Sequence, residues 1–227
     1  MAEPTDQEPP ERIGRPVGRT VRGAPFDGAF APASLSELGA AVQACRRCDL
    51  WRRATQGVAG EGPAPAVLML IGEQPGDQED LAGHPFVGPA GRLLDRGLIE
   101  AGLVRGDCYV TNAVKHFKFT PRGKRRIHAR PDAGEIDACR WWMDHEIRLV
   151  RPRAVVALGA SAGRAVFGRN VTVSRARGRA VPLKSGALGL LTVHPSYLLR
   201  LRDPEDKARG FAQLVEDLHA AKVLAEA

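Results

Sequence analysis

The chain of 227 residues is long enough to form one large domain with a sizeable core. Its 33 Lys and Arg exceed its 26 Asp and Glu by seven, and this charge favours a polyanionic partner such as a nucleic acid. No apolar run approaches the roughly 20 residues needed to span a bilayer, so no membrane partner is expected, and four cysteines are too few for a disulfide scaffold.

The beginning of the sequence predicts a flexible extension. Residues 1–30 hold several Pro and Gly with little periodic apolar sequence, so we expect them to precede a single domain over residues 31–227. The opening stretch MAEPTDQEPPERIGRP is acidic and proline-rich rather than basic and then apolar, which predicts a cytoplasmic protein. The folded unit should begin near Ser34, where SLSELGAAVQACRRC combines a helix cap with helical spacing and predicts a helix ending near Cys45 to Cys48.

Four short apolar runs predict buried strands. The first, VLMLI, is uninterrupted and is closed by Gly72, the pattern of a parallel strand covered on both faces. The four predicted strands are 67–71, 108–114, 154–159 and 188–193. The predicted helices between and after them are 88–103, 131–150, 161–168 and about 204–225. This alternation indicates a three-layer α/β/α sandwich around a central, mainly parallel four-stranded sheet.

In such a sheet the active crevice lies beyond the carboxyl ends of the strands. The four segments found there are GEQPGDQED, TNAVKHFKF, LGAS and VHPSY. The first presents Glu73 and Gln74, and it matches neither a GK[ST] phosphate loop nor a G-x-G-x-x-G fingerprint. A turn with solvated acids is the alternative. The last places His194 two residues before Ser196 without a G-x-S-x-G elbow, which argues against a serine hydrolase.

A strongly basic stretch follows the second predicted strand. Residues 115–128 read KHFKFTPRGKRRIH and hold six Lys or Arg, two His and two Phe. By composition alone, the simplest interpretation is a solvated basic loop that contacts a polyanion.

The cysteines suggest a metal or cluster site. Cys45 and Cys48 have the spacing of a metal-ligand pair, and Cys139 lies in a predicted helix that could return to them. Cys108 begins a strand whose crevice end is about 13 Å away at ~3.3 Å per residue. If the site lies near the crevice, His116 is the better fourth ligand. A zinc ion held by four cysteines is the alternative from spacing alone.

Together these segments resemble the uracil-DNA glycosylase superfamily, from about Ser34 to the final helix. GEQPGDQED, HPFVGPAGRLL, VTNAVK, EIDACRWW and VHPS look like the motifs of the family-four, iron-sulfur glycosylases. KHFKF followed by GKRRIH is similar to the UdgX branch, which cross-links itself to uracil-containing DNA. The resemblance implies a monomer that excises uracil from DNA, with single-stranded DNA favoured.

The resemblance also implies a [4Fe-4S] cluster with Cys45, Cys48 and Cys139 as ligands. Ordinary family-four members carry their remaining cysteine four residues after the strand-end Asn, at the position of His116 here. We therefore expect His116 to be the fourth ligand in place of Cys108. Imidazole replaces thiolate in some other iron-sulfur clusters.

The same resemblance assigns the uracil pocket. Phe86 is expected to stack on an extruded uracil, and Asn112 to bind its polar edge. His194 is expected to face the O2 oxygen, where negative charge develops during bond cleavage. Gln74 would complete the pocket through its side chain or its backbone.

The branch resemblance assigns a nucleophile. His128 is expected to attack C1′ of the sugar as a neutral imidazole, with Glu73 holding its other ring nitrogen. Lys124, Arg125 and Arg126 are expected to bind the phosphates that flank the flipped nucleotide. Two alternatives are an ordinary turnover glycosylase, in which His128 only contacts phosphate, and a non-catalytic iron-sulfur module that binds nucleic acid through the same segment.

Overall fold

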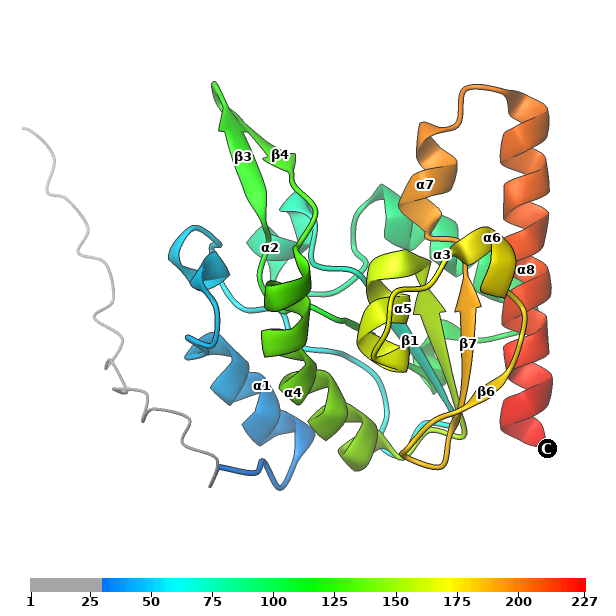
Figure 1. The fold of residues 1–227 in the computed structure, drawn as a ribbon, viewed down its shortest axis with the longest axis horizontal. Helices are drawn as coiled ribbons and strands as arrows, with labels where there is room; N and C mark the ends of the chain where they lie inside the picture. The colour runs from blue at the N-terminus through cyan, green and yellow to red at the C-terminus, as the bar shows by residue number, and fades with distance from the viewer. Residues whose placement is uncertain (1–29) are drawn as a thin grey trace, which may run out of the picture.

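A mostly parallel five-stranded sheet lies at the centre of residues 30–227, the part of the chain that the computed structural model describes (Figure 1). Apart from Phe30, the extension predicted over residues 1–30 lies outside the described residues. The strand order is β2-β1-β5-β7-β6. The strands are β1 (Leu68–Gly72), β2 (Cys108–Asn112), β5 (Ala154–Leu158), β6 (Val181–Pro182) and β7 (Leu188–Thr192).

The four predicted strands are confirmed and pair in parallel, but the predicted strand count of four is wrong. Strand β6 adds a fifth member at the edge, antiparallel to β7, with Val181 opposite Gly189 and Pro182 opposite Leu188. Two residues are too short to produce any periodic pattern, and Pro is tolerated there because an edge strand need not donate on both sides.

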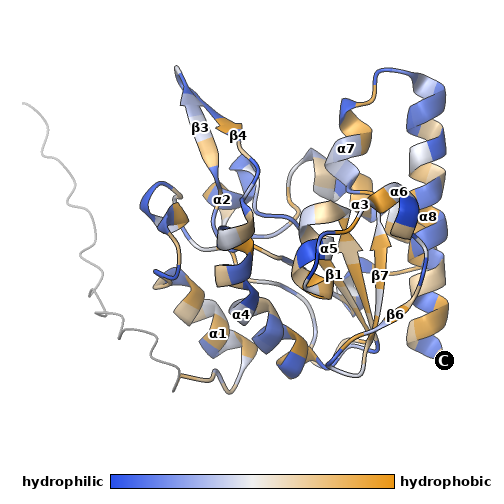
Figure 2. Cartoon of the chain, viewed as in Figure 1, coloured by the Kyte–Doolittle hydropathy of each residue, from blue (hydrophilic) through white to orange (hydrophobic). Residues whose placement is uncertain are grey.

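Helices cover both faces of the sheet, as predicted. One face carries α1 (Leu35–Gln43), α4 (Ala133–Val150) and α5 (Gly159–Phe167), and the other carries α3 (Pro89–Glu100) and α8 (Pro204–Glu226). In β1, Met69 and Ile71 belong to the apolar core beneath α1, α4 and α5. Leu68 and Leu70 belong to the core on the other face, beneath α3 and α8. Successive strand residues face opposite sides, so a strand covered twice is apolar throughout. Figure 2 shows β1 and β7 as predominantly hydrophobic beneath helices of mixed hydropathy.

The predicted cap of α1 is confirmed. The Ser34 hydroxyl accepts a hydrogen bond from the backbone N–H of Glu37 at 3.1 Å, which satisfies one of the free donors at the helix start. The helix ends at Gln43, slightly before the predicted end at Cys45 to Cys48. A short 3₁₀ turn, η1 (Asp49–Arg52), follows the cysteine pair.

The basic stretch is a β-hairpin rather than the predicted loop. Strands β3 (Phe119–Arg122) and β4 (Arg125–His128) pair antiparallel, and Phe119 lies opposite His128. Gly123 and Lys124 make the turn, and Gly123 adopts a φ of 58° that favours glycine. The hairpin projects beyond the carboxyl ends of the sheet (Figure 1). Because most of its side chains are exposed, it lacks the half-buried alternation by which strands are recognised.

Several short helices were also not predicted. They are α2 (Asp77–Ala82), η2 (Arg105–Asp107), α6 (Val173–Ala176) and α7 (Pro195–Arg200). Each spans less than two turns, so none can show a repeated helical pattern in sequence. Across residues 30–227, no helix combines the length and apolar character needed to cross a membrane.

Candidate functional site

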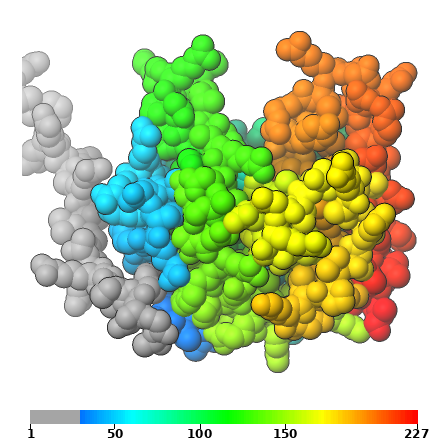
Figure 3. All heavy atoms as spheres, in the orientation of Figure 1, coloured from blue at the N-terminus to red at the C-terminus, as the bar shows by residue number. Residues whose placement is uncertain are grey.

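A cleft of about 1000 Å³ lies past the carboxyl ends of the parallel strands. Figure 3 shows the hairpin and the α7 region rising on either side of a hollow. The cleft brings together six predicted site residues: Glu73, Gln74, Phe86, Asn112, His128 and His194. They come from segments that are far apart in the sequence, so their convergence is produced by the sheet topology.

Phe86 and Asn112 meet over the end of β1. Phe86 is 5% exposed and adopts a φ of 58°, a left-handed conformation that is unfavourable for a residue with a large side chain. A Cβ atom at Gly72 would lie 2.3 Å from Asn112 Oδ1 and 2.5 Å from Phe86 Cζ. Gly72 therefore allows both side chains to approach the strand end. In the sequence, Gly72 is recognisable only as the end of the strand, because the close approach is a tertiary contact.

Gln74 uses its side chain to fasten the hairpin. Its Nε2 donates to the carbonyl oxygens of Lys118 at 3.1 Å and Ala129 at 3.0 Å, and its Oε1 accepts from the Lys118 N–H at 3.1 Å. These partners flank the hairpin on both sides. In this arrangement the amide is occupied by backbone groups, although Gln74 also lines the cleft.

Glu73 and His128 form the contact predicted for them. His128 Nε2 lies 3.3 Å from Glu73 Oε1, and the imidazole is half exposed. The Ser161 hydroxyl donates to Glu73 Oε2 at 2.5 Å. Burial alone would raise the pKa of Glu73, but the hydrogen bonds from His128 and Ser161 outweigh it and hold the pKa below its ordinary value. Glu73 is therefore a carboxylate that fixes one nitrogen of His128.

Ser161 and Arg130 complete this group and were not predicted individually. Arg130 Nε donates to the Ser161 hydroxyl at 3.1 Å and lies 3.8 Å from Glu73 Oε2. The sequence signal was partial: Ser161 belongs to LGAS, one of the four segments at strand ends. Nothing local distinguishes its serine from any other helix residue.

His194 is the N-cap of α7. Its Nδ1 accepts a hydrogen bond from the Ser196 N–H at 3.0 Å, which assigns the ring proton to Nε2. Burial lowers the pKa of His194 to about 4, and the Glu73 carboxylate opposes this only in part. At neutral pH the residue is thus a neutral imidazole with one N–H available to a ligand in the cleft.

This pKa predicts an acid-dependent loss of stability. An unfolded histidine takes up a proton near pH 6.5, whereas folded His194 resists protonation until about pH 4, so the unfolded state binds more protons between these values. Stability should therefore fall as the pH drops through this window. Between pH 7 and 5, we expect wild type to lose up to about 2 kcal/mol more than His194→Asn, which retains a capping acceptor. Urea unfolding of both proteins measures this difference, and equal losses would contradict it.

Arg126 has a different environment from the other predicted phosphate ligands. Its guanidinium contacts Asp77 Oδ1 at 2.6 Å and the fully buried Asp80 Oδ2 at 2.5 Å, which ties β4 to α2. Lys124 and Arg125, in contrast, are exposed at the hairpin turn. Arg126 thus anchors the hairpin through its ion pairs with Asp77 and Asp80. In the sequence it stands among other basic residues, and nothing there distinguishes it from them.

The three predicted cysteine ligands lie in one region. The indole N–H of Trp142 donates to Cys45 Sγ at 3.1 Å, and the Lys115 N–H donates to Cys139 Sγ at 3.2 Å. Cys48 and Cys139 each lie close enough to Cys45 to interact electrostatically with it. Burial raises the pKa of the Cys139 thiol to about 12 and also raises that of Cys48. A metal group would therefore have to displace protons from these thiols.

His116 directly follows Lys115, the donor to Cys139, whereas Cys108 lies on the other face of the sheet. Burial and the nearby charge of Arg46 lower the pKa of His116 to about 4, so its imidazole is neutral, as a ligand requires. Cys108 packs in the core on the opposite face of the sheet from Cys45 and Cys139, with its thiol 3.5 Å from the Val104 carbonyl oxygen. Its placement agrees with the prediction that it is not the fourth ligand.

A formed metal site is not seen among these donors. Within the described range, 30–227, no three or more His, Cys, Asp or Glu side chains form a group that could hold one metal ion. Ligands of a four-iron cluster each bind a different iron, so they need not converge on a point. Buried thiols that accept N–H donors are also the environment by which proteins tune such clusters.

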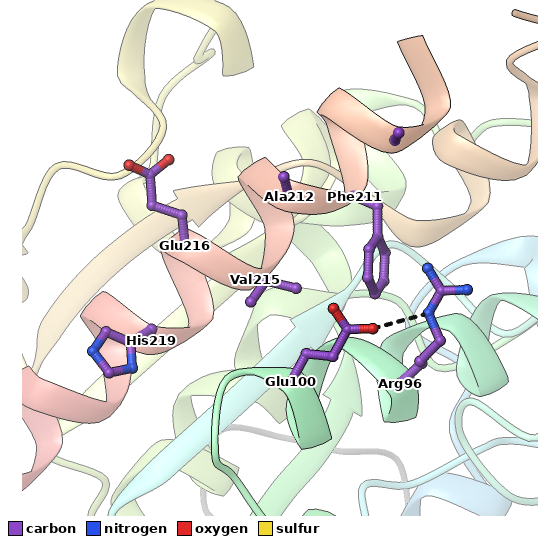
Figure 4. Close-up of a pocket in the computed structure, with 8 residues that line it drawn as sticks. Arg96, Glu100, Phe211, Ala212, Val215, Glu216 and His219 are labelled. Carbon is purple, nitrogen blue, oxygen red and sulfur yellow. Dashed lines mark ion pairs between the residues drawn. The ribbon is translucent and has the colours of Figure 1, made fainter. Parts of the chain in front are cut away.

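The remaining wall of the cleft was not predicted. It is formed by residues of α6, α7 and α8, among them Ser174, Arg177, Tyr197, Arg200 and Gln213. A second, shallower depression of about 590 Å³ lies between α3 and α8 (Figure 4). There Arg96 lies over the Phe211 ring and forms an ion pair with Glu100 at 3.4 Å. None of the predicted site residues lines it.

Comparisons with known proteins place this geometry in a family context. The profile described as the uracil DNA glycosylase superfamily matches residues 59–219. The chain is 37% identical over 182 residues to a type-4 uracil-DNA glycosylase of Thermotoga maritima, which covers 80% of this chain and 89% of that protein. It is 34% identical over 174 residues to a type-4 uracil-DNA glycosylase of Sulfurisphaera tokodaii, covering 73% and 76%. A type-5 uracil-DNA glycosylase of Pyrobaculum aerophilum is 33% identical over 141 residues, which cover 56% of this chain and 59% of that protein.

Proposed function

The chain belongs to the uracil-DNA glycosylase superfamily, and from this premise we propose that it excises uracil from DNA and then stays covalently attached to the abasic sugar through His128. The observation that carries the proposal is the placement of His128 at the cleft with one ring nitrogen held by the Glu73 carboxylate. This is the arrangement by which a carboxylate orients an imidazole for reaction.

Excision uses the inner part of the cleft. A uracil extruded from the stacked strand packs on Phe86, and the side-chain amide of Asn112 reads its polar edge. Breaking the bond between C1′ and N1 leaves the electron pair on the base. The Nε2–H of His194 then donates to the uracil O2, where the negative charge gathers. Because His194 is already neutral, no proton has to be removed from it before it acts.

Attachment uses the outer part of the cleft. As the base departs, the sugar becomes electron-poor at C1′. The lone pair of the His128 nitrogen turned away from Glu73 forms the new bond to C1′. The imidazole then carries a positive charge, which is removed when its other ring proton passes to Glu73. The uracil anion takes a proton from solvent, so atoms and charges balance.

The hairpin binds the backbone of the DNA strand. Lys124 and Arg125, exposed at its turn, bind phosphates next to the flipped nucleotide. Arg126 holds the hairpin against α2 through Asp77 and Asp80. A single strand fits this arrangement because no paired base has to be disrupted before extrusion.

A [4Fe-4S] cluster held by Cys45, Cys48, Cys139 and His116 is part of the proposal. The support is the burial of Cys45, Cys139 and His116, with Cys48 partly buried, and the N–H groups directed at two of the sulfurs. Cys45 and Cys48 after α1, His116 after β2 and Cys139 in α4 would hold the cluster, so its binding would join these three segments. Since His116 lies three residues before the first strand of the hairpin, this link would also restrain the base of the hairpin.

The test is a denaturing gel. Purified protein mixed with uracil-containing single-stranded DNA should give a protein–DNA species that survives heat and detergent, because the new bond is covalent. The same sequence with thymine should give none, since thymine is not excised. Equal binding of both DNAs without release of base would support a nucleic-acid-binding module instead.

The relatives favour a second candidate, an ordinary turnover enzyme. The proteins named above are type-4 and type-5 uracil-DNA glycosylases, and these names do not refer to covalent attachment to DNA. In that case His128 serves only as a contact to the DNA backbone, and each protein molecule releases many uracils. The ratio of uracil released to protein added distinguishes the two candidates. It reaches a limit near one for the covalent reaction and exceeds one for a turnover enzyme.

A further inference from the structure

An aromatic side chain between arginines lies on the turn that follows the cysteine pair. The guanidinium carbon of Arg46 lies 4.0 Å from the centre of the Trp51 ring, and that of Arg52 lies 5.0 Å from it. Both arginines are exposed, and Trp51 is partly exposed on η1. None of these residues takes part in the cleft.

This turn is joined to the hairpin by a further contact of the same kind. The Arg53 guanidinium lies 5.7 Å from the centre of the Phe119 ring on β3. Phe119 stacks on Phe117 with ring centres 5.2 Å apart, and Phe117 lies 6.2 Å from the His128 ring. Figure 1 shows the segment after α1 beside the base of the hairpin. Contacts between aromatic and cationic groups therefore run from His128 to the turn at Trp51.

The charge along this path is mainly positive. Its exposed cations are Arg46, Arg47, Arg52, Arg53, Arg122, Lys124 and Arg125. Asp49 offsets part of this charge, since it pairs with Arg52 at 2.8 Å. A surface that alternates cations with accessible aromatic rings is suited to a single nucleic-acid strand, because phosphates bind the cations and bases stack on the rings.

We propose that Arg46, Trp51, Arg52, Arg53 and Phe119, here called the arginine–tryptophan ridge, form a second DNA-contact site. It holds the unpaired strand on one side of the uracil, with a base stacked on Trp51 and phosphates on the arginines. The proposal rests on the proposed function for its ligand, since it extends the path of the same strand. It adds a site outside the cleft that contributes affinity without reading sequence.

Length-dependent binding is the first test. Fluorescence anisotropy would compare a short single strand carrying 2′-fluoro-2′-deoxyuridine, whose glycosidic bond resists cleavage, with strands carrying roughly ten more nucleotides on one side or on the other. We expect one of the two extensions to tighten wild-type binding by about tenfold. Trp51→Ala should lose this gain, whereas Trp51→Phe, which keeps a ring, should retain most of it. If neither extension tightens binding, or if Trp51→Ala keeps the gain, the ridge is not a DNA site.

Charge-matched variants give the second test. Arg46→Gln removes one cation from the ridge, and Arg209→Gln removes one exposed cation from α8. For the longer strand, Arg46→Gln should reduce the slope of log affinity against log salt by about 0.7, the value for one phosphate contact on a single strand. Arg209→Gln should leave the slope unchanged. Equal slopes for both variants would overturn the proposal.

A final comparison separates this proposal from the proposed function. The covalent adduct with the short strand carrying ordinary deoxyuridine should form at the same yield in wild type and in the ridge variants, which also shows that the variants fold. If the short strand gives no adduct with wild type, the covalent function fails, while anisotropy still reports on the ridge. If the adduct forms and the extensions have no effect, only the ridge fails.

Discussion

His128→Ser is expected to form no heat-stable adduct with uracil-containing DNA while still releasing some uracil. Serine lacks the imidazole lone pair that bonds to C1′, and its smaller side chain leaves room for water to attack instead. Phe86, Asn112 and His194 remain in place because they come from other segments of the chain. Adduct is measured on a denaturing gel, and free uracil is measured by chromatography of the same mixture.

Glu73→Gln is the matched variant for the same step. The amide keeps the shape of the side chain but lacks the charge that stabilises the imidazolium, so adduct formation should slow by roughly 100-fold without disappearing. The uracil released by His128→Ser should exceed one per protein molecule at long times. An adduct from His128→Ser, or many turnovers by wild type, would contradict the assignment of His128.

Lys115→Met is expected to lower the free energy of unfolding by about 3–5 kcal/mol. Lys115 Nζ lies 2.7 Å from Glu146 Oε2, and both side chains are completely buried. Removing the ammonium leaves the Glu146 carboxylate charged and without its counterion inside the core. Denaturation by urea at neutral pH measures the loss. An unchanged midpoint would show that the pair does not stabilise the fold.

A second variant separates the lost charge from the lost side chain. Glu146 also accepts hydrogen bonds from Thr111 Oγ1 and from the Gly60 N–H. In the double variant Lys115→Met with Glu146→Gln, a neutral acceptor remains and no isolated charge is buried, so part of the lost stability should return. If the double variant is as unstable as Lys115→Met, packing rather than charge explains the loss.

The same lysine connects the proposed cluster with the proposed uracil pocket. Lys115 Nζ donates to the Asn112 carbonyl oxygen at 2.8 Å, and its backbone N–H donates to Cys139 Sγ. Asn112 is thereby held from behind by a residue that also touches a proposed cluster ligand. The buried pair thus positions the end of β2 from which the base would be read.

The sequence was sufficient for the central sheet and for the side chains at its strand ends. Each parallel strand is an apolar run covered on both faces, so local composition specifies it. Because parallel strands end at one edge, Glu73, Asn112 and His194 had to meet once the strands were identified. The roles proposed for His128 and for the cluster ligands rest on motif resemblance, and the contact between His128 and Glu73 is compatible with the role proposed for His128.

Only the tertiary structure decided the contacts between segments. The hairpin, the use of Arg126 to bind Asp77 and Asp80, and the support of Glu73 by Ser161 were all missed. The two side-chain contacts join residues that are tens of positions apart, and the hairpin exposes most of its side chains, so none of the three leaves a periodic signal. The sequence therefore determined which residues stand at the edge of the sheet, whereas long-range packing decided which of them touch, because contact depends on how the segments between the strands fold back.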